Sequence, residues 1–407
     1  MNFIRRLFGR EMINKVPEIT VYFWIIKVLC TTVGETASDF LNVNLHFGLV
    51  GTSIVTGVLL LIALFFQFRS KRYVPGIYWV TVVMVSVFGT LVTDNLTDGM
   101  HVPLETSTIV FSVLLALTFA AWYAKEKTLA MHSIVTTRRE AFYWLAILFT
   151  FALGTASGDL MAESLGLGYL VTGAIVIGII AAVAVAWRWG LDATLAFWIV
   201  YILTRPLGAS LGDYLSQSQK YGGLGLGATA TSAIFLAAIL ATVIYLSRSK
   251  RDVETVTKDP APAPARSRNA LVQLVVVLAI IVLGGGAGYA WRRDTLQKAA
   301  GASSVQDAAP LHAQPLGDLT EFKTITDDTL ALVQAGKLAE AKTRVTDLET
   351  AWDDAEASLK PMNPAKWHEM DDAIDRVLTQ LRAAHPDQAA CAAALQALSD
   401  LIRIDQG

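Results

Sequence analysis

Residues 143–161 read YWLAILFTFALGTASGDLM, and the pattern in this segment predicts the architecture of the chain. It is long enough and apolar enough to cross a bilayer core of about 30 Å as a helix, yet it carries one carboxylate, Asp159. The same pattern occurs three more times, as FWIIKVLCTTVGETASDFL at 23–41, YWVTVVMVSVFGTLVTDNL at 78–96 and FWIVYILTRPLGASLGDYL at 197–215. Four copies in one register indicate an internal repeat.

Each copy has an aromatic residue before a Trp, a Gly ten positions after the Trp, and an Asp five positions after the Gly. A small residue stands four positions after each Gly, which is the spacing that lets two membrane helices approach closely. Because the Gly and the Asp lie about 140° apart around a helix, we expect one face to pack and another to present the acid. The tryptophans are Trp24, Trp79, Trp144 and Trp198, the glycines are Gly34, Gly89, Gly154 and Gly208, and the aspartates are Asp39, Asp94, Asp159 and Asp213.

The chain of 407 residues has the composition of an integral membrane protein, because hydrophobic types make up 54% of it and charged types only 17%. A net charge of −2 gives no basic field for nucleic acid, and Cys30 and Cys391 are too few for a disulfide framework. Nine stretches are predicted to span the membrane: 20–40, 46–67, 75–96, 105–124, 141–161, 167–187, 193–214, 224–246 and 270–290.

Basic residues such as Arg69 and Lys71 follow every second predicted span of the repeat region, whereas the alternate connections hold only one base, Lys220. The positive-inside rule therefore predicts a cytoplasmic N-terminus and a C-terminal part in the periplasm or outside the cell. Since each repeat contains two spans, all four repeats enter the membrane in the same direction. We expect an all-α fold of four parallel two-helix repeats with pseudo-fourfold symmetry about the membrane normal.

The sequence divides the chain into five parts. We expect a cytoplasmic N-terminus (1–19), a four-repeat membrane domain (20–250), a Pro/Ala linker (251–269), a ninth transmembrane helix (270–291) and a soluble helical bundle outside the membrane (310–407). Helices of the bundle are expected to break at Gly336 and at 361–364. Because the linker is extended, the ninth span and the repeats need not pack tightly.

The four aspartates need compensation, because a carboxylate within a membrane span costs about 2.5–3.5 kcal/mol on insertion. We expect them to converge on a polar cavity in the outer half of the membrane domain. Glu35 lies four residues before Asp39 and therefore on the same helical face. Lys27 and Arg205 are predicted charge partners that lie nearer the cytoplasm than the acids, although two bases cannot neutralise four carboxylates.

Plainer interpretations stay open for several of these residues. The aspartates would be ordinary polar caps if they sit at solvated helix ends. The tryptophans are typical of an aromatic belt at the cytoplasmic interface, and less so of residues that guide a cation through cation–π contacts. His46 and His101 follow the first and third spans, where they are either candidate metal ligands or simply solvated.

The repeated residues resemble a known family of bacterial multi-span membrane proteins, built from tandem repeats of unknown function that each have two spans and a characteristic tryptophan. The resemblance covers about residues 20–246 and rests on the four Trp-Gly-Asp copies. It implies the fold, the fourfold repeat and a place in the bacterial inner membrane, and it implies no activity.

The acids favour a transporter or channel for a small cation, in which Asp39, Asp94, Asp159 and Asp213 are the metal ligands and Glu35 assists them. Oxygen ligands suit hard divalent ions such as Mn²⁺, Mg²⁺ or Ca²⁺. No other cofactor is expected. The expected partners are the cation and the lipid bilayer, and a homo-oligomer is left open. The alternative is a membrane anchor or sensor that positions the C-terminal bundle. An enzyme is not expected, because the sequence has no HExxH, GxSxG or phosphate-cradling motif.

Overall fold

The computed structural model describes residues 14–252, 270–303 and 315–406. Three expected segments fall wholly or partly outside these ranges, namely residues 1–13 of the N-terminus, 253–269 of the linker, and 310–314 and 407 of the bundle. Within the described ranges every regular element is a helix. The membrane domain contains α2 (Val21–Asp39), α3 (Gly48–Arg69), α4 (Pro75–Thr97), α5 (Leu104–Glu126), α6 (Thr137–Asp159), α7 (Gly168–Arg188), α8 (Ala193–Ser216) and α9 (Gly227–Ser249).

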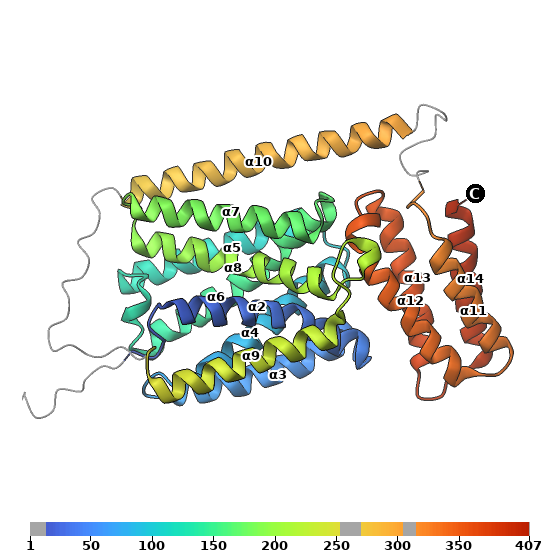
Figure 1. Cartoon of the computed structure of the whole chain (residues 1–407), viewed down its shortest axis with the longest axis horizontal. Helices are drawn as coiled ribbons and strands as arrows, with labels where there is room; N and C mark the ends of the chain where they lie inside the picture. The colour runs from blue at the N-terminus through green and yellow to red at the C-terminus, as the bar shows by residue number, and fades with distance from the viewer. Residues whose placement is uncertain (1–13, 253–269, 304–314, 407) are drawn as a thin grey trace, which may run out of the picture.

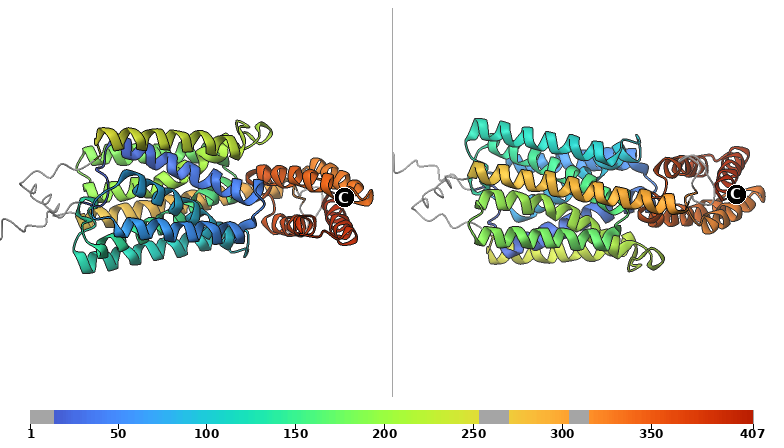
Figure 2. Two further views of the ribbon diagram at one scale, coloured as in Figure 1. Left: turned by 90° about the horizontal axis from the view of Figure 1, so that it is seen from below. Right: turned by 90° about the horizontal axis from the view of Figure 1, so that it is seen from above.

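The first helices of the four repeats form a closed ring. Helix α2 packs on α4, α4 on α6, α6 on α8, and α8 packs back on α2. Each outer helix packs mainly on the inner helix of the following repeat, α3 on α4, α5 on α6 and α7 on α8, while α9 closes the series on α2. All of them run side by side along one axis (Figures 1 and 2). This arrangement confirms the predicted parallel repeats with pseudo-fourfold symmetry.

A motif glycine lies in every seam of the ring. A Cβ atom on Gly34 would lie 1.9 Å from the Ser86 hydroxyl oxygen, so any side chain there would overlap the next inner helix. The same overlap occurs at all four seams, which explains why glycine recurs at this position. The glycines and the residues they face are Gly34 and Ser86, Gly89 and Phe151, Gly154 and Arg205, and Gly208 and Thr31.

Eight helices of the described part are long and apolar enough to cross a membrane: α3 to α9 and α10 (Ala270–Ser303). Helix α2, the first of the nine predicted spans, is not among them. Its 19 residues include Lys27, Glu35 and Asp39. Because α2 is enclosed by α4, α8 and α9, it needs no apolar surface all round and runs beside the other helices.

Helix α10 lies beside α7 and continues to Ser303, beyond the expected end at 291 (Figure 1). Its polar contacts are with the loops at the two ends of α7 and with Glu105 in the first turn of α5, which accepts from the Tyr289 hydroxyl at 2.8 Å. The Gln273 side chain accepts from the backbone nitrogen of Asp192 at 2.9 Å and donates to the Gly190 carbonyl at 3.0 Å. Arg292 donates to the Leu165 carbonyl at 2.7 Å. The apolar side chains between these ends are exposed, as expected for a helix that faces lipid.

The bundle consists of α11 (Thr320–Gln334), α12 (Leu338–Leu359), α13 (Pro364–Arg382) and α14 (Gln388–Gln406). Its core includes the stacked rings of Trp352 and Trp367, with centroids 3.8 Å apart. The chain leaves α11 at Gly336, whose φ of 74° suits glycine. Helices α12 and α13 are separated at the predicted 361–364 segment.

The bundle packs against the end of the membrane domain at which the motif aspartates lie (Figure 1). Gln217 donates to the Asp354 carbonyl at 2.6 Å, and Lys220 forms an ion pair with Glu321. Polar and charged groups on the facing surfaces therefore join the bundle to the repeats.

Candidate functional site

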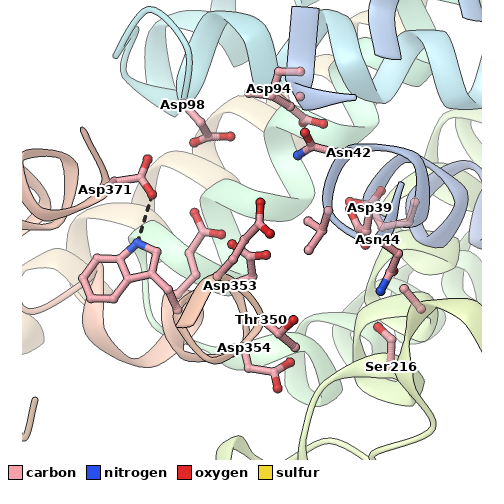
Figure 3. A pocket seen from close by; sticks show the side chains of 18 of the residues that line it. Asp39, Asn42, Asn44, Asp94, Asp98, Ser216, Thr350, Asp353, Asp354 and Asp371 are labelled. Atoms are coloured by element: carbon pink, nitrogen blue, oxygen red, sulfur yellow. Dashed lines mark hydrogen bonds between the residues drawn. The ribbon is translucent and has the colours of Figure 1, made fainter. Parts of the chain in front are cut away.

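A cavity of about 1060 Å³ lies between the inner helices and the bundle (Figure 3). The four motif aspartates, Asp39, Asp94, Asp159 and Asp213, all line it, one from each inner helix. Each side chain is half-buried, and within the described ranges none of the four carboxylates accepts a hydrogen bond or joins an ion pair. The aspartates are close to helix ends, as the plainer interpretation expects, but they face one shared cavity.

Two of the four repeats change their helical form directly after the aspartate. π-helical turns, η1 (Phe40–Asn44) and η3 (Leu160–Ser164), follow Asp39 and Asp159, whereas α4 and α8 stay α-helical past their aspartates. The π turns place Asn42 and Glu163 in the cavity lining. Such turns are uncommon and recur at functional sites. At the cavity, the fourfold pattern is therefore reduced to an alternating one.

The cavity has further acids that the sequence analysis missed. Asp98 follows Asp94 by four residues and Glu163 follows Asp159 by four, so each pair shares a helical face. This spacing was a usable signal. From the bundle come Asp353, Glu356 and Asp371, and their only sequence signal is the Asp-Asp-Ala triplet that occurs at both 353–355 and 371–373.

The pKa values of the carboxyls that the bundle contributes are raised in this crowded group of acids. Burial raises the pKa of Asp353 well above its usual range, and the charges of Glu349 and Glu356 raise it further. Burial together with the charge of Asp375 also raises the pKa of Asp371, whose carboxylate accepts from the Trp352 indole at 2.9 Å (Figure 3). These carboxyls favour a bound proton, or a cation that neutralises them.

Arg205 and Glu35 form the floor of the cavity. Glu35 lines the cavity, and its carboxylate pairs with the Arg205 guanidinium, which is only 1% exposed. The same guanidinium donates to the Thr90 hydroxyl and to the Thr31 carbonyl, the latter at 3.4 Å. Arg205 thus ties α2, α4 and α8 together. Its acidic partner is Glu35, and it makes no ion pair with a motif aspartate.

Lys27 does not act as a charge partner of any acid among the described residues, contrary to expectation. Its side chain is 1% exposed, and its ammonium lies 3.7 Å from the ring centre of Phe151 and 4.3 Å from that of Tyr201. No hydrogen-bond partner for its nitrogen occurs in the described ranges. The reason is its position two helical turns before Glu35, where the ring interior is aromatic.

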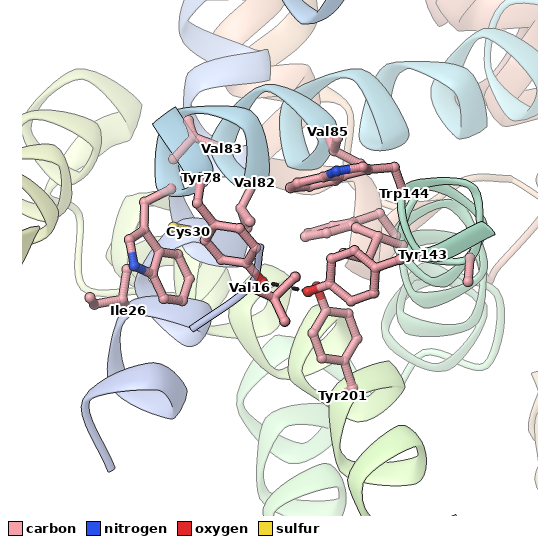
Figure 4. Packing of buried hydrophobic residues seen from close by; sticks show 14 of the residues in the cluster. Val16, Ile26, Cys30, Tyr78, Val82, Val83, Val85, Tyr143, Trp144 and Tyr201 are labelled. Atoms are coloured by element: carbon pink, nitrogen blue, oxygen red, sulfur yellow. Dashed lines mark hydrogen bonds between the residues drawn. The ribbon is translucent and has the colours of Figure 1, made fainter. Parts of the chain in front are cut away.

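Aromatic side chains, among them Tyr78, Tyr143 and Tyr201, pack together in the ring interior (Figure 4). The hydroxyls of Tyr78 and Tyr143 are hydrogen-bonded to each other there. Three motif tryptophans, Trp79, Trp144 and Trp198, are at most 4% exposed, whereas Trp24 is half-buried. The interpretation as an interfacial belt is therefore wrong for three of the four. These rings face the protein interior and close the space beneath the cavity.

The two candidate histidines lie apart. His46 lines the cavity, while His101 contacts the bundle, with Nε2 3.5 Å from an Asp372 carboxylate oxygen and its ring centre 4.6 Å from that of His368. Across the described part of the chain, no three His, Cys, Asp or Glu side chains are grouped closely enough to hold one metal ion. The predicted metal ligands, Asp39, Asp94, Asp159 and Asp213, thus share a cavity without forming a ready coordination shell.

A family model described as a Repeat of Unknown Function (DUF347) matches residues 22–73, 77–128, 142–190 and 196–252. The chain belongs to the DUF347 family. Each DUF347 repeat contributes one inner helix, one outer helix and one motif aspartate. No curated protein and no solved structure matches the chain. Because the DUF347 description gives no activity, the function has to be inferred from the geometry of the cavity.

Proposed function

We propose that this membrane protein transports a small metal cation, and that it has no catalytic role. The observation that carries the proposal is the convergence of four equivalent carboxylates, one from each repeat, on one acidic cavity. Within a membrane domain such groups are costly unless water, protons or cations compensate their charge. No base among the described residues forms an ion pair with these aspartates, because Arg205 is paired with Glu35 and Lys27 lies among aromatic rings.

A hydrated divalent ion fits this cavity best. Carboxylate oxygens suit hard cations such as Mg²⁺, Mn²⁺ and Ca²⁺, and Mg²⁺ keeps several waters when bound. The cavity has room for an ion with its water shell, and its carboxylates are not drawn together into a direct coordination sphere. We therefore infer that the aspartates attract and hold the ion largely through water.

A carrier that alternates between two conformations fits better than an open pore. Beneath the cavity lie the buried Arg205 and Lys27, and then the bonded hydroxyls of Tyr78 and Tyr143. An ion needs these groups to move before it can pass. The alternative of an anchor for the C-terminal bundle explains the contacts with the bundle, but it gives no reason for an aspartate in each repeat.

The proposed orientation keeps the basic helix ends in the cytoplasm. Arg69, Lys125 and Arg248 lie in the last turns of α3, α5 and α9, and the bundle packs at the other end of the domain. The positive-inside rule then places the cavity and the bundle on the periplasmic or extracellular side.

Flux measurements in liposomes test the proposal. Purified protein should move at least one ion from a panel of Mg²⁺, Mn²⁺ and Ca²⁺, and Asp94→Asn or Asp159→Asn should reduce that flux about tenfold or more, because each removes a charge and keeps the side-chain size. Asp192→Asn is the matched control. Asp192 caps α8 by accepting from Thr194 and Leu195, a role that Asn also performs. Normal flux in both aspartate variants would overturn the assignment.

A further inference from the structure

The bundle places a positive charge against three carboxylates that line the acidic cavity. Lys360 follows the last residue of α12, and its side chain is only 5% exposed. Its ammonium lies 2.5 Å from a carboxylate oxygen of Glu356, 3.2 Å from one of Asp98 and 3.2 Å from one of Glu163. Glu356 belongs to α12 and lies four residues before Lys360, whereas Asp98 and Glu163 come from the second and third repeats.

The charge on Lys360 is permanent at physiological pH. Burial alone lowers the pKa of this amine, but the charges of Asp98, Glu356 and Glu163 outweigh burial and raise the pKa well above its usual range. The three carboxylates therefore surround a cation that the chain itself supplies. An incoming cation would meet the ammonium at the carboxylates that would otherwise attract it, and like charges repel strongly in a partly buried site.

We propose that Lys360 is a tethered blocking group, which holds the place of an incoming cation at the carboxylates of Asp98 and Glu163 until the bundle moves away. The inference rests on the proposed function, since it describes how access to the transport cavity is regulated. It also gives the C-terminal bundle a role: docking of the bundle closes the cavity, and displacement of α12 and α13 removes the ammonium and exposes Asp98 and Glu163.

Other contacts of the bundle make a matched control available. Lys220, in the loop between α8 and α9, pairs with Glu321 of α11, and both side chains are largely exposed. This pair also joins the bundle to the membrane domain, but Glu321, unlike the partners of Lys360, does not line the cavity. A variant at Lys220 therefore removes a docking contact and leaves the Lys360 charge in place beside the cavity carboxylates.

Mn²⁺ binding to the purified full-length protein tests the proposal by measuring free Mn²⁺ with electron paramagnetic resonance. Lys360→Met should bind Mn²⁺ about tenfold more tightly than the unsubstituted protein, Lys220→Met should bind as the unsubstituted protein does, and Asp98→Asn added to Lys360→Met should remove the gain. Lys360→Gln provides a second neutral variant if the methionine variant is poorly folded. Unchanged Mn²⁺ affinity in folded Lys360 variants, or an equal gain in Lys220→Met, overturns the proposal.

Flux separates this inference from the function on which it rests. If transport occurs, Lys360→Gln should raise the initial rate of Mn²⁺ uptake into liposomes, and Lys220→Met should not. A protein that shows the Mn²⁺ affinity gain but moves no ion would refute transport and support occupation of the site by Lys360. A protein that moves Mn²⁺ equally well with and without the Lys360 charge would support transport and refute the blocking role.

Discussion

Replacing Gly208 by Ala is predicted to loosen the seam at which the fourth repeat closes on the first. The added Cβ would lie 2.0 Å from Thr31 Oγ1 and 2.9 Å from the Thr31 backbone carbonyl carbon. Rotation of the Thr31 side chain cannot relieve the second contact. It would also remove the hydroxyl's bonds to the carbonyls of Val28, at 2.7 Å, and Thr204, at 3.0 Å. Helices α2 and α8 must therefore move apart.

The size of the effect follows from two opposing contributions. Overpacking a close contact costs about 1–3 kcal/mol, and replacing glycine within a helix by alanine regains about 0.5–1 kcal/mol. Because a backbone atom is among those overlapped, the upper half of the overpacking range applies, and the expected net loss in the free energy of unfolding is about 1–2.5 kcal/mol. For a domain of this size, each kcal/mol lowers the melting temperature by about 2–4 °C, so we expect a fall of about 2–10 °C.

Thermal unfolding of the purified protein in detergent, followed by tryptophan fluorescence, measures this fall. Gly178→Ala is the matched control, because Gly178 lies in α7 and, apart from its own stretch of helix, no atom lies within 4 Å of the position of its Cβ. The control should melt at the same temperature as the unsubstituted protein or slightly higher. If Gly208→Ala also melts there, or if both variants fall equally, close packing at the seams does not hold the ring together.

Two further predictions concern buried charge. Burial raises the pKa of Asp354 to about 6 from 3.8, so the charged form is disfavoured in the folded state. Asp354→Asn should therefore raise the melting temperature at pH 7, and this gain should shrink as the pH falls through about 6 and vanish below 3.8. A gain that is constant with pH would contradict burial of the charge as the cause. Lys27→Met should raise the melting temperature because it removes a buried amine that has no hydrogen-bond partner among the described residues, while a fall would show that the contacts with Phe151 and Tyr201 outweigh the cost of burial.

The ring of inner helices could be predicted from the sequence because each pattern that indicates it occurs four times. One Gly at a helix seam is a weak pattern, but Gly34, Gly89, Gly154 and Gly208 at one spacing indicate four equivalent contacts. The orientation of each Trp was not predictable in the same way. An aromatic residue near a helix end suits lipid headgroups and a packed interior equally, and only the assembled ring places three of the tryptophans inside.

Contacts between the bundle and the repeats could not be predicted, because nothing local signals them. Lys360 and Asp98 are 262 positions apart, and Lys360 in the sequence is an ordinary base after an amphipathic helix. Its neighbours become apparent only when α12 is placed against the ends of α4 and η3. A composition rule that assigns the bundle to solvent is right for most of its surface and says nothing about this face.

Departures from the repeat give the cavity its direction. A strictly fourfold ring would surround its axis with identical acids, which would attract a cation equally from all sides. In this protein the second and third repeats add Asp98 and Glu163, which hold Lys360, whereas the first and fourth contribute Glu35 and Arg205, which hold each other. Among the cavity acids that the described repeats contribute, the carboxyl groups that no base pairs with are therefore the four aspartates, and the added acids Asp98 and Glu163 lie on the side that the bundle covers. A cation entering beneath a displaced Lys360 would meet Asp98 and Glu163 before it reached the aspartates, and the paired Arg205 would oppose its further passage until Glu35 or the floor moved.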